Sequence, residues 1–208
     1  MNFCVSVAVI TLTIGLWSVS GATEAPRRTG WSLGAGPRLQ WLTGSGYDEL
    51  RLWYLDNPGY GGELTIGYGL TDRWAGRIAA STNRHSGSIR SEGFAWAAVD
   101  LLFLLPLRRF DPYVLARLGK QAVTAFNVNL GQTEEIVEGT WAGWMGGGGL
   151  GVRCWVVPRV SLHTEAVYTY VRISDLVEND DTGTAIRLAK TYDGTTWGIT
   201  ILAVEYHW

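Results

Sequence analysis

The sequence predicts an all-β fold: an eight-stranded antiparallel up-and-down transmembrane β-barrel. Three observations predict it: runs of alternating apolar and polar residues, connections that alternate between short and long, and a last strand that runs to the final residue. A tilted strand needs about 9–11 residues to cross a bilayer, whereas a globular strand averages about five or six. The runs match the first length and cover residues 31–43, 61–71, 74–84, 94–105, 112–123, 141–157, 160–172 and 196–208.

Composition limits the alternatives. The chain has 208 residues, which suits one domain, and a mean hydropathy of +0.06, which is too polar for a bundle of membrane helices. Its 27 glycines and 11 tryptophans favour tight turns and aromatic anchoring over long helices. The net charge of -2 gives no support to a nucleic-acid partner, and we expect none.

The N-terminus predicts export. Residues 3–19 carry no charge, and Ser20 and Ala22 occupy the small-residue positions of a cleavage site. We therefore assign residues 1–22 to a signal peptide and residues 23–208 to the barrel domain, with an uncleaved membrane anchor as the alternative. Only Cys154 remains after cleavage, so no disulfide can form within the mature chain.

The connections differ in length along the chain. Three are short, namely "TDR", "LRRFDP" and "PR". The others are long and polar: "SGYDELRLWYLDNPGY", "HSGSIRSEG", "TAFNVNLGQTEEIVEGTW" and "ISDLVENDDTGTAIRLAKTYDGTT". Short turns at one end and long loops at the other are typical of outer-membrane barrels.

Alternation alone does not show which face of each strand points inward. A soluble lipocalin-like barrel buries its apolar face, whereas a membrane barrel exposes that face to lipid. Glycines crowd the polar face, where an eight-stranded barrel has little room. Aromatic residues gather at the ends of the apolar face, as in interfacial girdles, and these two features favour the membrane barrel. The aromatic residues are Trp31, Trp41, Tyr68, Trp74, Tyr168, Tyr170, Tyr206 and Trp208.

Several segments resemble the small outer-membrane barrels of the OmpA/OmpX type. They are "GGELTIGYGLTDRW", "FDPYVLARLG", "GWMGGGGLGVRCWV" and "SLHTEAVYTYVRISD", and the resemblance covers about residues 30–208. It implies a porin-family barrel in a Gram-negative outer membrane, reached after export. The ending "LAVEYHW" resembles the C-terminal signal read by the barrel-assembly machinery, which would involve Leu202, Val204, Tyr206 and Trp208.

Charged residues in the middle of the strands share the polar face and are balanced in sign. A buried charge without a partner is costly, so we expect a paired network across the lumen. One interpretation is a polar core that holds the barrel closed. The other is a gate for a narrow ion pore, in which these pairs exchange partners. The inward residues are Arg38, Glu63, Arg77, Asp100, Arg117, Arg153, His163, Glu165 and Glu205.

Candidate catalytic and metal residues are few. Ser161, His163 and Glu165 share one face of a strand, but residues two apart on a strand are separated by about 6.8 Å. Their order also differs from the His-x-Ser pattern of lipid A deacylases. We therefore expect no enzyme activity and no catalytic residues, with a lipid-modifying enzyme as the alternative. His85 and His207 lie far in sequence from His163, so we expect no metal site and no cofactor.

The expected partners follow from the expected location. They are outer-membrane lipid, lipopolysaccharide and the barrel-assembly machinery. The long loop with Trp53 and Tyr54 adds an unidentified ligand at the outer loops, because exposed aromatics on a polar loop mark binding surfaces. The remaining alternative is a soluble barrel that binds a small ligand.

Overall fold

The computed structural model describes residues 25–44, 58–86, 92–128, 137–178 and 185–208. Within these ranges there is no helix long and apolar enough to cross a membrane. The predicted signal peptide lies outside the described residues. The strands are β1 (Gly30–Thr43), β2 (Gly59–Gly69), β3 (Trp74–His85), β4 (Glu92–Leu104), β5 (Phe110–Val128), β6 (Val137–Val157), β7 (Val160–Glu178) and β8 (Ala185–His207).

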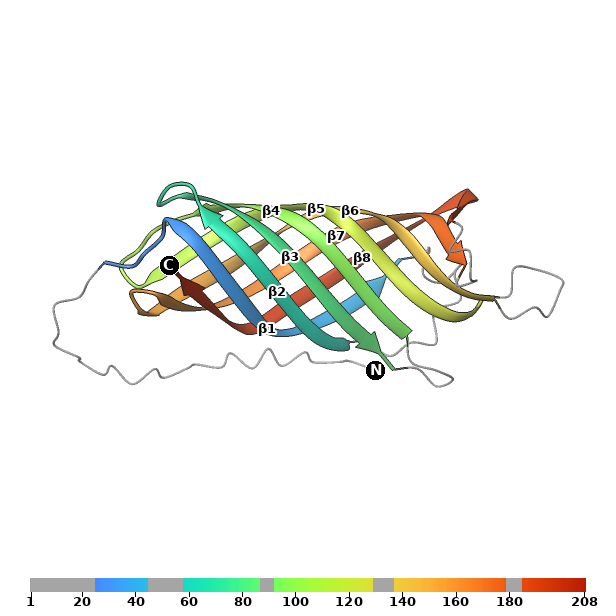
Figure 1. The fold of residues 1–208 in the computed structure, drawn as a ribbon, viewed down its shortest axis with the longest axis horizontal. Coiled ribbons are helices and arrows are strands. Elements are labelled where there is room, and N and C mark those ends of the chain that lie inside the picture. The colour runs from blue at the N-terminus through green and yellow to red at the C-terminus, as the bar shows by residue number, and fades with distance from the viewer. Residues whose placement is uncertain (1–24, 45–57, 87–91, 129–136, 179–184) are drawn as a thin grey trace, which may run out of the picture.

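The strands form one closed barrel (Figure 1). Each strand pairs antiparallel with the next, and β1 closes the ring against β8 with Ser32 opposite His207. Closure leaves no unpaired strand edge, which a membrane cannot tolerate. The last residue takes part, because the Trp208 backbone N–H donates to the Trp31 carbonyl at 3.1 Å. The predicted fold class is confirmed.

The barrel has two unlike ends. The short connections at residues 70–73, 105–109 and 158–159 lie at one end, which we call the turn end. The C-terminus lies at this end too, at the left of Figure 1. The opposite end, where the four longer connections are, is the loop end.

The eight predicted runs correspond to the eight strands, but two predicted loops were too long. Strands β5 to β8 continue toward the loop end and reach 19 to 23 residues. Val128 still pairs with Val137, and Val177 with Ala185, beyond the end of the apolar alternation. Backbone hydrogen bonds can continue a hairpin after the alternation of apolar and polar residues has ended. The alternation therefore underestimates the length of these strands.

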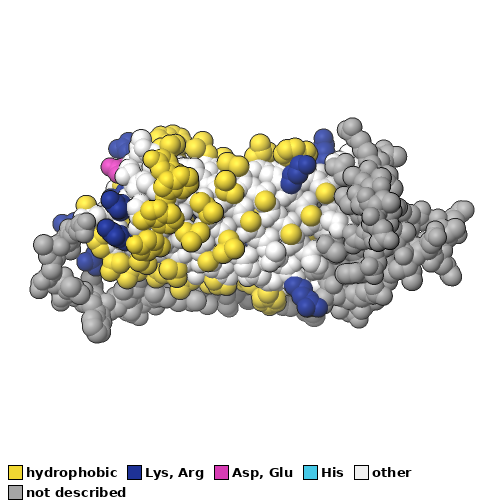
Figure 2. Space-filling view, in the orientation of Figure 1, with side chains coloured by type: hydrophobic (Ala, Val, Ile, Leu, Met, Phe, Trp, Pro, Cys, Tyr) yellow, Lys and Arg dark blue, Asp and Glu magenta, His cyan; other side chains and the backbone are white. Residues whose placement is uncertain are grey.

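The outer wall is apolar and the interior is polar. Figure 2 shows apolar side chains gathered in a dense band near the turn end, with basic side chains toward both ends. Aromatic residues such as Trp31, Trp74 and Trp208 are about half exposed near the turn end. This distribution suits a wall in contact with lipid rather than water. Large aliphatic residues in the exposed set include Leu33, Leu64, Ile66, Ile78, Val99, Leu101, Val114, Leu118, Leu150 and Val204.

Strand β8 contains a bulge. Its register shifts by one residue against both neighbours near residues 201–202, and Ile201 and Leu202 are both exposed. Before the bulge Thr196 and Thr200 point inward, whereas after it Glu205 and His207 do. The bulge therefore decides which polar groups of β8 reach the lumen.

Candidate functional site

Six charged side chains meet inside the barrel, and each is at most 5% exposed. Inward positions on six of the eight strands supply them, and they carry three positive and three negative charges. We call this set the central network. Its members are Arg38, Glu63, Arg77, Asp100, Arg117 and Glu165.

Asp100 lies between two arginines because the sheet register places Arg77 on one side of it and Arg117 on the other. Arg77 Nη2 lies 2.6 Å from Asp100 Oδ2, and Arg117 Nε lies 2.7 Å from Oδ1. Arg117 Nη2 also donates to Oδ2 at 2.8 Å, which completes a bidentate contact. Both carboxylate oxygens therefore have charged partners.

Glu165 reaches the same arginines from β7. Arg77 Nη2 is 2.9 Å from Glu165 Oε2, and Arg117 Nη2 is 3.4 Å from Oε1. The Tyr113 hydroxyl donates to Oε2 at 2.9 Å. A Cβ at Gly151 would clash with the Tyr113 ring, so this glycine makes room for the tyrosine. Tyr113 was not among the predicted site residues.

Arg38 and Glu63 form the third part of the network. Arg38 Nη1 is 2.7 Å from Glu63 Oε2 and donates to Thr200 Oγ1 at 3.1 Å. The indole of Trp96 contacts the guanidinium groups of Arg38 and Arg117 at 4.9 and 4.3 Å from its ring centre. The network is thus packed against an aromatic surface as well as paired.

The other three predicted residues lie nearer the turn end. Arg153 Nη2 is 2.9 Å from Glu205 Oε2, and His163 Nδ1 is 3.7 Å from the same oxygen. All three are buried inside the barrel. The structure therefore divides the nine predicted charged and polar residues between two clusters.

A further ion pair near the turn end was missed. Arg28, just before β1, lies 2.9 Å from Asp111 of β5, and the Trp155 indole N–H donates to Asp111 at 2.6 Å. Asp111 is fully buried. The sequence contained one indication of this pair. Asp111 lies at the start of β5 beside a turn, and an aspartate in that position either faces water or pairs with a buried partner.

Apolar side chains also line the lumen, which the sequence analysis did not predict. A smaller group that includes Leu102, Leu104 and Leu115 lies toward the turn end. The residues of the larger group lie on the loop-end side of the central network and fill that part of the interior. We call them the outer apolar cluster. They are Leu42, Ala79, Phe94, Trp96, Ala98, Val123, Trp141, Met145, Val171 and Ile173.

The three residues considered as a catalytic set, Ser161, His163 and Glu165, do not form a triad. The histidine beside Ser161 is His207 of β8, whose Nε2 lies 3.0 Å from Ser161 Oγ. Glu205 Oε2 lies 3.7 Å from that same Nε2, so it does not orient the ring through Nδ1 as a triad acid does. Ser161 is fully buried, and Glu165 is held by the central network.

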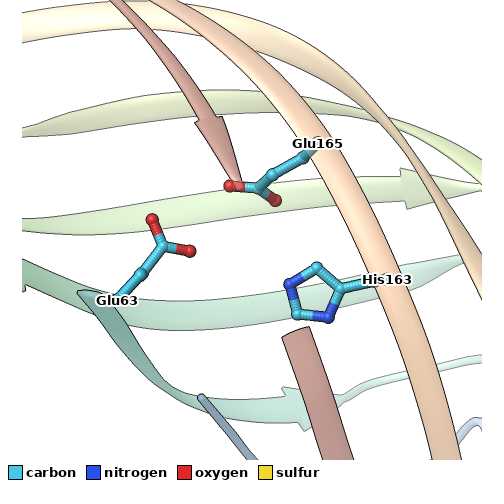
Figure 3. A group of neighbouring side chains, drawn as sticks. All are labelled: Glu63, His163 and Glu165. Atoms are coloured by element: carbon cyan, nitrogen blue, oxygen red, sulfur yellow. The ribbon is translucent and has the colours of Figure 1, made fainter. Parts of the chain in front are cut away.

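The structure brings Glu63, His163 and Glu165 together, although they were predicted only as parts of a charged lining. One ligand atom from each lies within 4.8 Å of the others, and all three residues are buried. Figure 3 shows the two carboxylates and the imidazole turned toward a common point. Sequence spacing could not reveal this, because β2 and β7 are brought together by barrel closure.

The C-terminal residues of the predicted assembly signal all face outward. Leu202, Val204, Tyr206 and Trp208 are between 45% and 52% exposed, at the turn end of β8. They form part of the apolar outer wall. The loop with Trp53 and Tyr54 lies outside the described residues.

Comparison with known proteins gives a fold. No protein-family model matches the chain, and no curated protein matches it either. Among solved structures, the Neisserial surface protein A is similar with a TM-score of 0.53 and 18% identity, over 86% of this chain and 98% of that one. The chain therefore has the fold of the small eight-stranded outer-membrane barrels of the OmpA/OmpX type.

Two further outer-membrane proteins overlap the barrel less well. OprG of Pseudomonas aeruginosa has a TM-score of 0.49 and 12% identity, over 88% of this chain and 99% of that one. Ail, the attachment invasion locus protein of Yersinia pestis, has a TM-score of 0.45 and 18% identity, over 86% and 99%.

The Glu165→Gln substitution is predicted to destabilise the barrel by about 3–5 kcal/mol, because it leaves two buried arginines short of a charged partner. The free energy of unfolding in urea, measured in lipid vesicles, checks this. The control is Asp193→Asn, which breaks the solvent-exposed pair with Arg172 and should leave the unfolding midpoint unchanged. Equal midpoints for Glu165→Gln and the control would contradict the prediction.

Proposed function

We propose that this protein is a non-enzymatic barrel of a Gram-negative-type bacterial outer membrane, with a structural or surface-interaction role. The observation that carries the proposal is an apolar outer wall around a charged and filled interior. In water this arrangement would expose the wall and bury the charges, which is unfavourable on both counts. In a bilayer the same arrangement is stable.

The long hairpins of the loop end support a surface role. A strand needs about 9–11 residues to cross the bilayer. Strands β5 to β8 have 19 to 23 residues, so they project well beyond it. Such a projection presents a rigid support for the outer loops, where we place the unidentified ligand or partner. The C-terminal residues from Leu202 to Trp208 are proposed to be the segment that the barrel-assembly machinery recognises.

Cysteine labelling tests location and orientation. In a Cys154→Ala background, Thr191→Cys at the loop end should react with a membrane-impermeant maleimide on intact cells. Asp72→Cys at the turn end should react only after the outer membrane is permeabilised. Adding Trp208→Ser should reduce labelled Thr191→Cys severalfold, because less protein is assembled. Labelling of both sites on intact cells would contradict the proposed location.

The absence of enzyme activity is supported by the site geometry. The buried Ser161–His207 pair has no aligned acid, and a nucleophile needs access to its substrate. Both side chains lie inside the barrel near the turn end, away from outer-leaflet lipid. We therefore interpret the contact between Ser161 and His207 as a hydrogen bond that stabilises the fold.

Lipopolysaccharide is the proposed lipid partner, and a groove in the outer wall supports it. The groove has a volume of about 730 Å³, and Lys120 at its side lies 5.0 Å from the Trp144 ring centre. Figure 2 shows scattered apolar side chains on the wall between the dense apolar band and the loop end. An acyl chain fits the groove while a phosphate meets Lys120 or the nearby exposed Arg84. The small outward residues are Gly62, Ala80, Thr82, Ala95, Ala97, Ala122 and Ala142.

The Lys120→Glu substitution should lower the amount of lipopolysaccharide that copurifies with the protein by at least about fivefold, because it replaces an attractive charge with a repulsive one. Native mass spectrometry of the purified protein measures it. The matched control is Arg73→Glu at the turn end, which should retain the wild-type amount. Equal retention by Lys120→Glu and the control would exclude this lipid contact.

A gated narrow pore is a second candidate function, because the central network offers alternative pairs. Arg38 Nη1 lies 3.9 Å from Glu165 Oε1, and Arg117 Nη2 lies 3.9 Å from Glu63 Oε2. Small side-chain movements would therefore exchange partners without leaving a charge alone. The outer apolar cluster is the second barrier, so the resting state is closed.

Planar-bilayer recordings test the gate. Wild-type protein should show brief openings of small conductance, and Glu165→Ala or Arg117→Ala should change the single-channel conductance. Trp96→Ala should raise the open fraction severalfold, because the indole packs on both arginines. The exposed variant Asp193→Asn should match the wild type. A wild-type protein that never conducts would exclude the gate.

A further inference from the structure

We propose that Glu63, His163 and Glu165 form a binding site for one divalent transition-metal ion of the zinc type inside the lumen. Their ligand atoms, one from each residue, lie within 4.8 Å of one another. Two strands supply them, β2 and β7, which are not neighbours in the barrel. Small side-chain rotations would bring three such atoms to the about 2.0–2.2 Å bond lengths of zinc.

Two of the three residues have polar atoms that lack hydrogen-bond partners. Glu63 Oε1 and both ring nitrogens of His163 are buried without one, among the described residues. Both residues are 2% exposed. A buried polar atom without a partner is costly, and such an atom in a native protein usually faces a water molecule or an ion. The three atoms are therefore available to coordinate an ion.

The imidazole is oriented as a metal ligand would be. His163 Nδ1 faces the Glu205 carboxylate at 3.7 Å, so a proton on Nδ1 would lie on the side of that carboxylate. Nε2 then keeps its lone pair free. Figure 3 shows a ring nitrogen of His163 turned toward Glu63. A carboxylate behind a histidine is a common outer shell of metal sites.

The two carboxylates are also held from behind. Arg38 contacts Oε2 of Glu63 and leaves Oε1 free, while Tyr113 and Arg77 hold Glu165. Glu165 is therefore held in place before an ion arrives, whereas Glu63 keeps one oxygen free to meet it. Calcium and magnesium prefer six or more oxygen ligands, so one imidazole with two carboxylates selects a zinc-type ion.

The charges around the proposed site limit its affinity for a divalent ion. The central network is neutral as it stands, so a divalent ion adds two positive charges near its arginines. Arg38 lessens this cost because it has other partners, the Thr200 hydroxyl at 3.1 Å and the Trp96 ring at 4.9 Å. We therefore expect moderate binding in which Glu63 shifts from Arg38 toward the ion.

Cobalt(II) absorption spectroscopy of the purified, folded barrel in detergent tests the site. One equivalent of Co²⁺ should give ligand-field bands that Zn²⁺ abolishes by competition. His163→Gln should weaken binding at least tenfold, and the control Asp193→Asn should bind as the wild type does. Wild-type barrel without bands, or His163→Gln with wild-type affinity, would overturn the proposal.

A second measurement needs no variant, in case His163→Gln fails to fold. The electron paramagnetic resonance spectrum of wild-type protein with one equivalent of Cu²⁺ should show coupling to one imidazole nitrogen. A spectrum with oxygen ligands only, or one with nitrogen from more than one imidazole, would contradict the assigned ligands.

Discussion

The need to pair every charge buried inside the barrel constrains the rest of this structure. Asp100 is neutralised by Arg77 on one side and Arg117 on the other, and only one register of β3, β4 and β5 allows both contacts. A slip of one residue would turn these side chains into lipid, where an unpaired charge costs several kilocalories per mole. The paired charges therefore stabilise one register of these strands. That register in turn determines how the strands are staggered when the barrel closes.

The interior is layered along the barrel. Arg28 and Asp111 pair near the turn end, the central network crosses the lumen, and aromatic side chains such as Trp141 fill the part beyond it. A polar layer supplies specific pairing, whereas an apolar layer supplies packing and excludes water. This combination explains how a filled barrel can be stable and still contain groups able to exchange partners or bind an ion.

The sequence predicted the parts of this arrangement that depend on alternation. Arg38 and Glu165 could be assigned inward because their strands alternate clearly. The stretch Phe94–Leu104 is apolar on both faces except at Asp100, so the pattern did not show that Trp96 and Leu102 pack inside the barrel beside this charge. Parity changes at the β8 bulge, and side-chain partners across the lumen depend on how far the strands are staggered. A local sequence pattern predicts neither the position of the bulge nor the stagger of the strands.

A double-mutant cycle on the pair Asp100 and Arg117 tests the central claim most directly. Asp100→Leu and Arg117→Leu should each destabilise the barrel by about 3–5 kcal/mol in urea unfolding, because each leaves the buried network with one charge that is no longer balanced. The double variant should lose clearly less than the sum of the two, because it removes both charges together. Strictly additive losses would show that the two side chains act independently, and would contradict the claim that paired burial holds the barrel in register.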